Sequence, residues 1–108
     1  MKIAITAMGP DLEARVDPRF GRAAFFLIVD TETQQFEVID NTVNVNAAGG
    51  AGTRSAECVV TAGARHVLTG DVGPKAQRGL QAGGVGVTTG LGGTCREALE
   101  AFQAHAAE

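Results

Sequence analysis

The sequence has no tryptophan and no tyrosine, and its five aromatic residues are all phenylalanine. No run interleaves these phenylalanines with basic residues, as single-stranded nucleic-acid binders do when they place stacking rings beside cations. The formal net charge is −3, from 9 Lys and Arg against 12 Asp and Glu, so the basic excess of a DNA- or RNA-binding domain is also missing. We therefore expect no nucleic-acid partner.

Long apolar runs are absent too. No stretch approaches the roughly 18–20 apolar residues that a membrane-spanning helix needs, so we expect no membrane partner. The first residues, Met1 to Ile5, begin a strand pattern and not the hydrophobic region of a signal peptide. Cys58 and Cys95 are the only cysteines, and without an export signal both are expected to remain free thiols. The sequence predicts a cytoplasmic protein.

The length of the chain fits one domain. Domains most often have about 100–150 residues, and this chain has 108. A chain of this size can bury roughly two thirds of its unfolded surface, which is enough for one core without a metal or a disulfide. Since 44% of the residues are hydrophobic but few are aromatic, the core must consist mostly of Val, Leu, Ile and Ala. We expect a single domain over residues 1–108.

Apolar runs and turn residues predict five strands and three helices. The strands are expected at Lys2–Ala7, Ala24–Asp30, Gln35–Asn41, His66–Thr69 and Val85–Thr88, and the helices at Arg54–Ala62, Pro74–Ala82 and from Thr94 onward. The polar turn Thr31–Gln34 predicts an antiparallel hairpin between the second and third strands. The later alternation of strands and helices requires parallel strands with right-handed crossovers. The fold class is therefore α/β, with a mixed five-stranded sheet and helices on its faces.

Three glycine-bearing loops lead directly into the predicted helices. The start of a helix presents unpaired backbone N–H groups and about half a positive charge, and each of these starts also carries a basic residue. Such loops at the ends of strands predict an anion-binding site. The candidate residues are Gly49, Gly50, Gly52, Thr53 and Arg54 in the first loop, Gly70, Asp71, Gly73 and Lys75 in the second, and Gly93, Thr94 and Arg96 in the third.

Two familiar phosphate-binding motifs are missing. Nothing matches Gly-x4-Gly-Lys-Ser/Thr, and no Gly-x-Gly-x-x-Gly follows the first strand, so neither a Walker loop nor a dinucleotide site is indicated. Glycine is also common before the helices of any α/β domain. Each loop by itself is therefore open to a purely structural interpretation.

The hexapeptide Asp17-Pro18-Arg19-Phe20-Gly21-Arg22 is the most distinctive segment of the first long loop. Pro18 fixes a turn, Phe20 can cover the end of the sheet, and Arg19 and Arg22 can add positive charge to the predicted anion-binding site. The alternative is a solvated turn in which Asp17 pairs with an arginine. Chemistry alone favours the solvated turn.

Four segments occur in the order and at the spacing of a known family. They are the hexapeptide, the Gly49–Gly52 loop with Thr53-Arg54, Gly70-Asp71-Val72-Gly73-Pro74-Lys75 and Leu80-Gln81-Ala82-Gly83-Gly84-Val85. In these motifs the chain resembles the dinitrogenase iron–molybdenum cofactor biosynthesis family over essentially its whole length. The resemblance implies a three-layer α/β/α, ribonuclease-H-like fold with sheet order 3-2-1-4-5.

The resemblance also implies a cofactor. Members of the family bind or shuttle metal–sulfur clusters for nitrogenase assembly, and one free-standing member holds a molybdenum–copper sulfide cluster. The implied ligand is therefore an anionic molybdenum–copper sulfide cluster or an iron–molybdenum cofactor-like cluster. Other cofactor-assembly proteins or an ATPase would be the protein partners.

One departure from the family affects how a cluster would be held. Some members have a histidine in the small-residue loop, where this sequence has Ala47-Ala48-Gly49-Gly50-Ala51. Hydrogen bonds, helix dipoles and charge are therefore the expected means of binding. Cys95 is the one candidate metal ligand, because a thiol at the start of a helix has a lowered pKa. Cys58 is expected to be a small buried residue in the middle of its helix.

Catalysis finds little support in the sequence. A nuclease with a ribonuclease-H-like fold needs carboxylates that hold metal ions, usually including one in the first strand, and Lys2–Ala7 has none. We expect a non-enzymatic protein that binds or carries an anionic metal–sulfur cluster. The alternative is a regulatory module that binds a small anion or a nucleotide.

Overall fold

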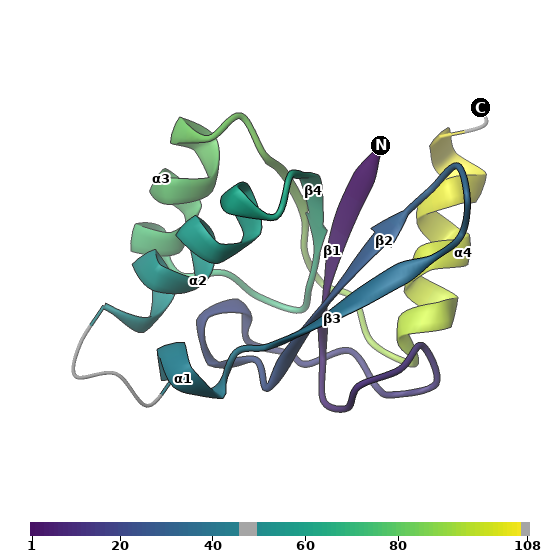
Figure 1. Ribbon diagram of the computed structural model, residues 1–108, viewed down its shortest axis with the longest axis horizontal. Coiled ribbons are helices and arrows are strands. Elements are labelled where there is room, and N and C mark those ends of the chain that lie inside the picture. Colours follow the sequence, from purple (N-terminus) through teal and green to yellow (C-terminus); the bar gives the residue numbers. More distant parts are fainter. Residues whose placement is uncertain (46–49, 107–108) are drawn as a thin grey trace.

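The computed structural model describes residues 1–45 and 50–106 and contains a five-stranded mixed sheet (Figure 1). The strands lie in the order β3-β2-β1-β4-β5, where β1 is Lys2–Ala7, β2 Phe25–Asp30, β3 Phe36–Asp40, β4 Ala64–Leu68 and β5 Gly86–Thr88. β2 pairs antiparallel with both β1 and β3, whereas β4 pairs parallel with both β1 and β5. The predicted fold class and strand order are confirmed.

Helices cover both faces of the sheet. Helices α2 (Ala51–Thr61) and α3 (Pro74–Ala82) pack on one face, and α4 (Cys95–Ala106) packs on the other (Figure 1). β1 and β2 are almost entirely apolar because side chains on both of their faces are buried. The core therefore has two halves, one around Phe26, Val59 and Leu80 and the other around Ile5, Leu27 and Leu99.

The predicted hairpin forms through its polar turn. A carboxylate oxygen of Asp30 accepts hydrogen bonds from the Glu32 N–H at 2.9 Å and the Thr33 N–H at 3.4 Å. Gln34 completes the turn with a φ of 66°. These bonds reverse the chain at once, so β2 and β3 pair from Phe25↔Asp40 to Val29↔Phe36.

Several elements differ from the predicted bounds. Helix α2 begins at Ala51 and not at Arg54, and the short helix α1 (Thr42–Val45) and the 3-10 turn η1 (Phe20–Arg22) were not predicted. Glycine and asparagine have low intrinsic helix propensity, so contacts with neighbouring elements determine whether the segments that contain them become helical. The first-turn Gly52 of α2 packs closely against Ala76 of α3. Residues 46–49, including the candidate Gly49, lie outside the described part.

All three long helices begin at the same end of the sheet, where β1 and β4 finish (Figure 1). The long connection between β1 and β2 crosses this end and contacts the loops around it. Within the described ranges, no helix is long and apolar enough to span a membrane. The described parts of the loops that the sequence predicts to bind an anion therefore all lie at this end of the sheet.

Candidate anion-binding site

The segment Asp17–Ala24, here called the clamp, connects the starts of α2 and α3. On one side, the Phe20 N–H donates to the carbonyl of Asp71 at 3.0 Å. On the other, a Cβ placed on Gly21 would lie 3.0 Å from the Cα of Gly52. The clamp therefore brings the predicted hexapeptide into contact with the loops of both helices.

Buried polar groups hold the clamp against the ends of β1 and β4. Asp17 is only 8% exposed, and its carboxylate accepts hydrogen bonds from the N–H groups of Arg19 at 3.1 Å and Ala24 at 3.4 Å. The buried hydroxyl of Thr6 donates to the Asp17 carbonyl at 2.8 Å and contacts the hydroxyl of Thr69 at 2.9 Å. Within the described part of the chain, backbone N–H groups and not arginine side chains are the partners of the Asp17 carboxylate.

A second buried polar cluster fixes α2 beside the clamp. The amide of Asn41 donates to the carbonyl of Ala23 at 2.9 Å and to the hydroxyl of Ser55 at 3.2 Å. Sequence reasoning missed both polar clusters. Polar residues next to apolar strands were the available signal, but a sequence does not reveal which of them meet.

Helices α2 and α3 both begin directly after a glycine. Their N-cap residues, Gly50 and Gly73, have no side chain, and no side-chain cap is made at either helix. Among the described residues, no acceptor contacts the N–H groups of Lys75 and Ala76 at the start of α3. The start of α3 therefore offers donors, and both starts present the positive end of a helix dipole.

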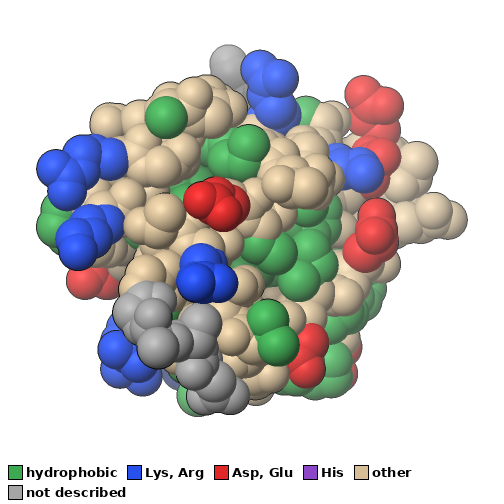
Figure 2. All heavy atoms as spheres, turned by 60° about the vertical axis from the view of Figure 1, so that its left-hand side comes forward, with side chains coloured by type: hydrophobic (Ala, Val, Ile, Leu, Met, Phe, Trp, Pro, Cys, Tyr) green, Lys and Arg blue, Asp and Glu red, His purple; other side chains and the backbone are tan. Residues whose placement is uncertain are grey.

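Four exposed cations lie on the clamp and on these two helices. Arg19 and Arg22 are on the clamp, Arg54 is on α2 and Lys75 is on α3, and none forms a salt bridge with a described residue. A Cβ built on Gly50 would lie 3.9 Å from Nε of Arg54, so this side chain folds back toward the start of its own helix. On the α2–α3 side, blue Lys and Arg side chains lie mostly at the left of the view and acidic ones mostly at the right (Figure 2).

The start of α4 differs, and the expectation that it also offers free donors is wrong. The N–H groups of Cys95 and Arg96 donate to the carbonyls of Ala14 and Leu12, both at 2.8 Å. These acceptors belong to the connection between β1 and β2. They occupy the donors that an anion would need.

Side chains complete the closure of this helix start. The Thr94 N–H donates to the Glu97 carboxylate at 2.9 Å, while the Glu97 N–H donates to the Thr94 hydroxyl at 3.1 Å, which is a reciprocal capping box. Arg96 pairs with Glu13, and the Gly93 carbonyl accepts from the Val16 N–H. The N–H groups of Thr94, Cys95 and Arg96 are therefore occupied, and we do not place Gly93 and Thr94 in the site at α2 and α3.

The expectation of a lowered pKa at Cys95 is also wrong. Its side chain is fully buried in the α4 half of the core, and burial, together with the charge of Asp11, raises the thiol pKa to about 11. Cys58, expected to be buried, is half-buried on α2, and desolvation raises its pKa as well. Within the described residues, no group of three or more His, Cys, Asp or Glu side chains could hold a metal ion.

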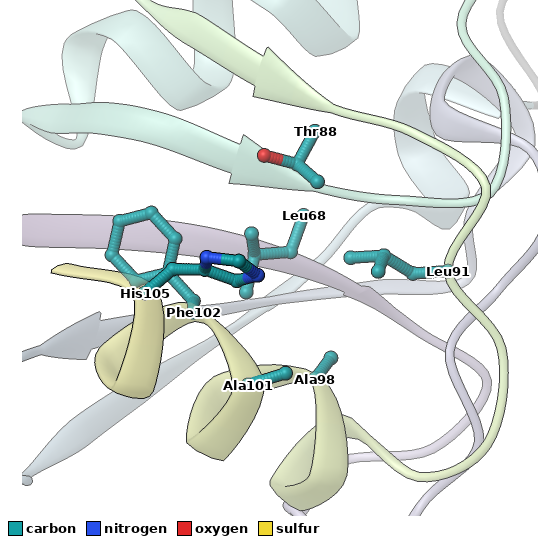
Figure 3. A pocket seen from close by; sticks show the side chains of 7 residues that line it. All are labelled: Leu68, Thr88, Leu91, Ala98, Ala101, Phe102 and His105. Carbon is teal, nitrogen blue, oxygen red and sulfur yellow. The ribbon is translucent and has the colours of Figure 1, made fainter. Parts of the chain in front are cut away.

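A separate apolar pocket of about 460 Å³ lies beside α4, on the opposite face of the sheet from α2 and α3. Figure 3 shows Phe102 and His105 of α4 facing Leu68, with Thr88 and Leu91 across the opening. Its lining contains none of the predicted site residues and little polar surface. The candidate site is therefore the surface formed by the clamp and the starts of α2 and α3, here called the mouth because the ends of the strands lie beneath it.

The whole chain has known relatives. An uncharacterised protein from Methanocaldococcus jannaschii is 37% identical over 79 residues, a match that spans 70% of this chain and 63% of the relative. The solved apo form of the orange protein from Desulfovibrio gigas is 45% identical, with a TM-score of 0.93 over 96% of this chain and 88% of that chain. A putative NifB protein from Thermotoga, solved by NMR, is 38% identical, with a TM-score of 0.83 over 95% and 87% of the two chains.

The family comparison covers nearly the same range. The family model described as dinitrogenase iron–molybdenum cofactor matches residues 1–105, which include the clamp and both helix starts of the candidate site. The chain therefore belongs to the dinitrogenase iron–molybdenum cofactor family.

Proposed function

We propose that this protein binds and carries an anionic, molybdenum-containing metal–sulfur cluster without catalysing a reaction. The cluster would be of the molybdenum–copper sulfide or the iron–molybdenum cofactor type, carried in the cytoplasm and exchanged with cofactor-assembly or ATPase proteins. One observation carries the proposal: two helix starts without side-chain caps lie against the clamp, and these three elements carry four exposed cations that form no salt bridge with a described residue. Membership of the family supports a metal–sulfur cluster as the anion that is bound.

The residues of the mouth fit such a cargo through charge and hydrogen bonding. Sulfide ligands on the surface of a polyanionic cluster can accept hydrogen bonds from backbone N–H groups, which are strongest when one partner is charged. We assign the contacts to the first turns of the two helices, with cationic side chains around them. The proposed residues are Gly50, Gly52, Thr53 and Arg54 on α2, Gly70, Asp71, Gly73 and Lys75 around the start of α3, and Arg19 and Arg22 on the clamp.

Asp71 has a different part in this set. Its carbonyl accepts the Phe20 N–H and so ties the clamp to the α3 loop. Its exposed carboxylate can only accept hydrogen bonds when ionised, and it repels an anion. We therefore propose that Asp71 marks the boundary of the site and that its main chain, not its carboxylate, serves binding.

The proposal is tested by mixing metal-free protein with tetrathiomolybdate and copper, removing unbound metal and measuring the visible absorption of the protein. Arg54→Ala and Lys75→Ala should each weaken binding by about tenfold to a hundredfold, because a hydrogen bond to a charged group contributes about 1.5–3 kcal/mol. Arg65→Ala is the matched control. It removes an exposed cation at the start of β4, the opposite end of the strand from the site.

Two results would contradict the proposal in different ways. If Cys95→Ser abolishes the chromophore while Lys75→Ala leaves it intact, a thiolate holds the metal and the charge-based mode of binding is wrong. If the wild-type protein retains no coloured cluster, carriage fails. Binding of inorganic phosphate or a nucleotide at the same residues would then support the alternative of a small-anion regulatory module, since the same donors suit phosphate.

A further inference from the structure

We propose that Asp17 is a positioning residue, which holds Arg19 and Arg22 at the mouth of the anion-binding site. The inference rests on the proposed function. The Asp17 carboxylate accepts the N–H of Arg19 through one oxygen and the N–H of Ala24 through the other. A single side chain therefore ties together the two ends of the short segment that carries both arginines.

Asn41 also holds the far end of the segment, since its amide donates to the Ala23 carbonyl and its N–H to the Ala24 carbonyl, both at 2.9 Å, but the hydrogen bonds within the turn itself are weak. Inside its 3-10 turn, the Arg22 N–H reaches the Arg19 carbonyl at 3.3 Å and the Ala23 N–H reaches the Phe20 carbonyl at 3.3 Å, both long for such bonds. Phe20 anchors the middle of the turn, since it is 1% exposed and packs against Phe26. The arginines on either side of Phe20 are exposed, so their direction depends on the backbone at the ends of the turn.

A carboxylate beside an anion-binding site is unfavourable on charge alone. If Asp17 acted only through its charge, Asp17→Asn would remove a repulsion and tighten the binding of an anion. If Asp17 positions the two arginines, the same substitution loosens anion binding, because the asparagine amide has one acceptor oxygen and must lose one of the two N–H bonds and weaken the other. The two roles therefore predict opposite signs for one measurement.

The experiment measures the affinity of the whole protein for tetrathiomolybdate with copper. Asp17→Asn should lose about tenfold, the difference between a charged and a neutral acceptor. Asp11→Asn is the matched control, because one of its carboxylate oxygens caps the N–H groups of Glu13 and Ala14 in the same long connection but outside the clamp. That control should bind as tightly as the wild type or slightly tighter.

A double-mutant cycle separates positioning from a general loss of structure. If Asp17 acts through the arginines, the joint substitution Arg19→Ala and Arg22→Ala should cost much less affinity in the Asp17→Asn background than in the wild type. Additive losses would overturn the inference. So would an unchanged or increased affinity of Asp17→Asn. Should Asp17→Asn fail to fold, Asp17→Ser, whose hydroxyl can still accept from the Arg19 N–H, enters the same cycle with the same expected outcomes.

Amide hydrogen exchange gives an answer that does not depend on the cargo. Exchange at Arg19 and Ala24 should accelerate at least tenfold in Asp17→Asn but not in Asp11→Asn, while the amides of the sheet keep their protection. Unchanged exchange at these two amides would overturn the positioning role. If wild type retains no thiomolybdate but exchange responds as expected, cluster carriage fails while the structural part of this inference stands.

Discussion

Gly70→Ala should destabilise the protein, because the added methyl group meets the backbone of the clamp. A Cβ on Gly70 would lie 2.7 Å from both the Cα and the carbonyl oxygen of Pro18, and ordinary contact begins near 3.4 Å. No rotation of a side chain relieves an overlap with main-chain atoms, so Pro18 must move by about 0.7 Å. Overpacking of this kind costs about 1–3 kcal/mol, and we expect about 2 kcal/mol of lost unfolding free energy.

Urea denaturation followed by circular dichroism measures this loss. Gly92→Ala is the control, because a Cβ there would have no atom within 4 Å and the residue is not among those with a left-handed φ. The control should change the unfolding free energy by less than about 0.5 kcal/mol. Affinity for thiomolybdate should fall with Gly70→Ala as well, since Pro18 lies between Asp17 and Arg19. Equal stability of Gly70→Ala and the wild type would refute the close seating of the clamp on Gly70.

Two further predictions concern groups that titrate. Cys58 should react with iodoacetamide before Cys95, because Cys95 is fully buried with a thiol pKa of about 11 while Cys58 is half-buried. Peptide mapping after brief labelling of the folded protein measures the order of reaction. Preferential labelling of Cys95 would contradict its burial. Burial lowers the pKa of His66 below its usual 6.5, so the unfolded chain takes up the proton first and the free energy of unfolding should fall as the pH drops through about 6.5. His66→Gln should flatten that part of the stability profile, and identical slopes for the two proteins between pH 8 and pH 5 would rule out this contribution.

Much of the fold follows from local sequence. Alternation and apolar runs placed β1 at Lys2–Ala7 and α3 at Pro74–Ala82, as observed. The polar residues 31–34 predicted the antiparallel hairpin, because a short turn leaves the chain no room for a crossover. Boundaries failed where packing between distant segments outweighs propensity, as in α2, which begins three residues before the predicted Arg54 and includes Gly52, a residue that lies against Ala76 of α3.

The candidate site was only partly accessible from the sequence. The hexapeptide and two of the glycine loops were identified by their composition, and the structure brings them into contact through Phe20 with Asp71 and Gly21 with Gly52. The role of Asp17 was not decided by composition. Only the folded chain shows that the partners of its carboxylate are the N–H groups of Arg19 and Ala24.

The start of α4 shows where the information in the sequence ends. By composition it matches the other two helix starts, with glycines followed by a basic residue. In the folded protein the carbonyls of Leu12 and Ala14, more than 80 positions away, occupy the N–H groups of Arg96 and Cys95. The sequence by itself determined that each helix has a start able to donate hydrogen bonds. Tertiary structure decided which starts keep free donors, because that depends on the distant backbone acceptors that fold against them.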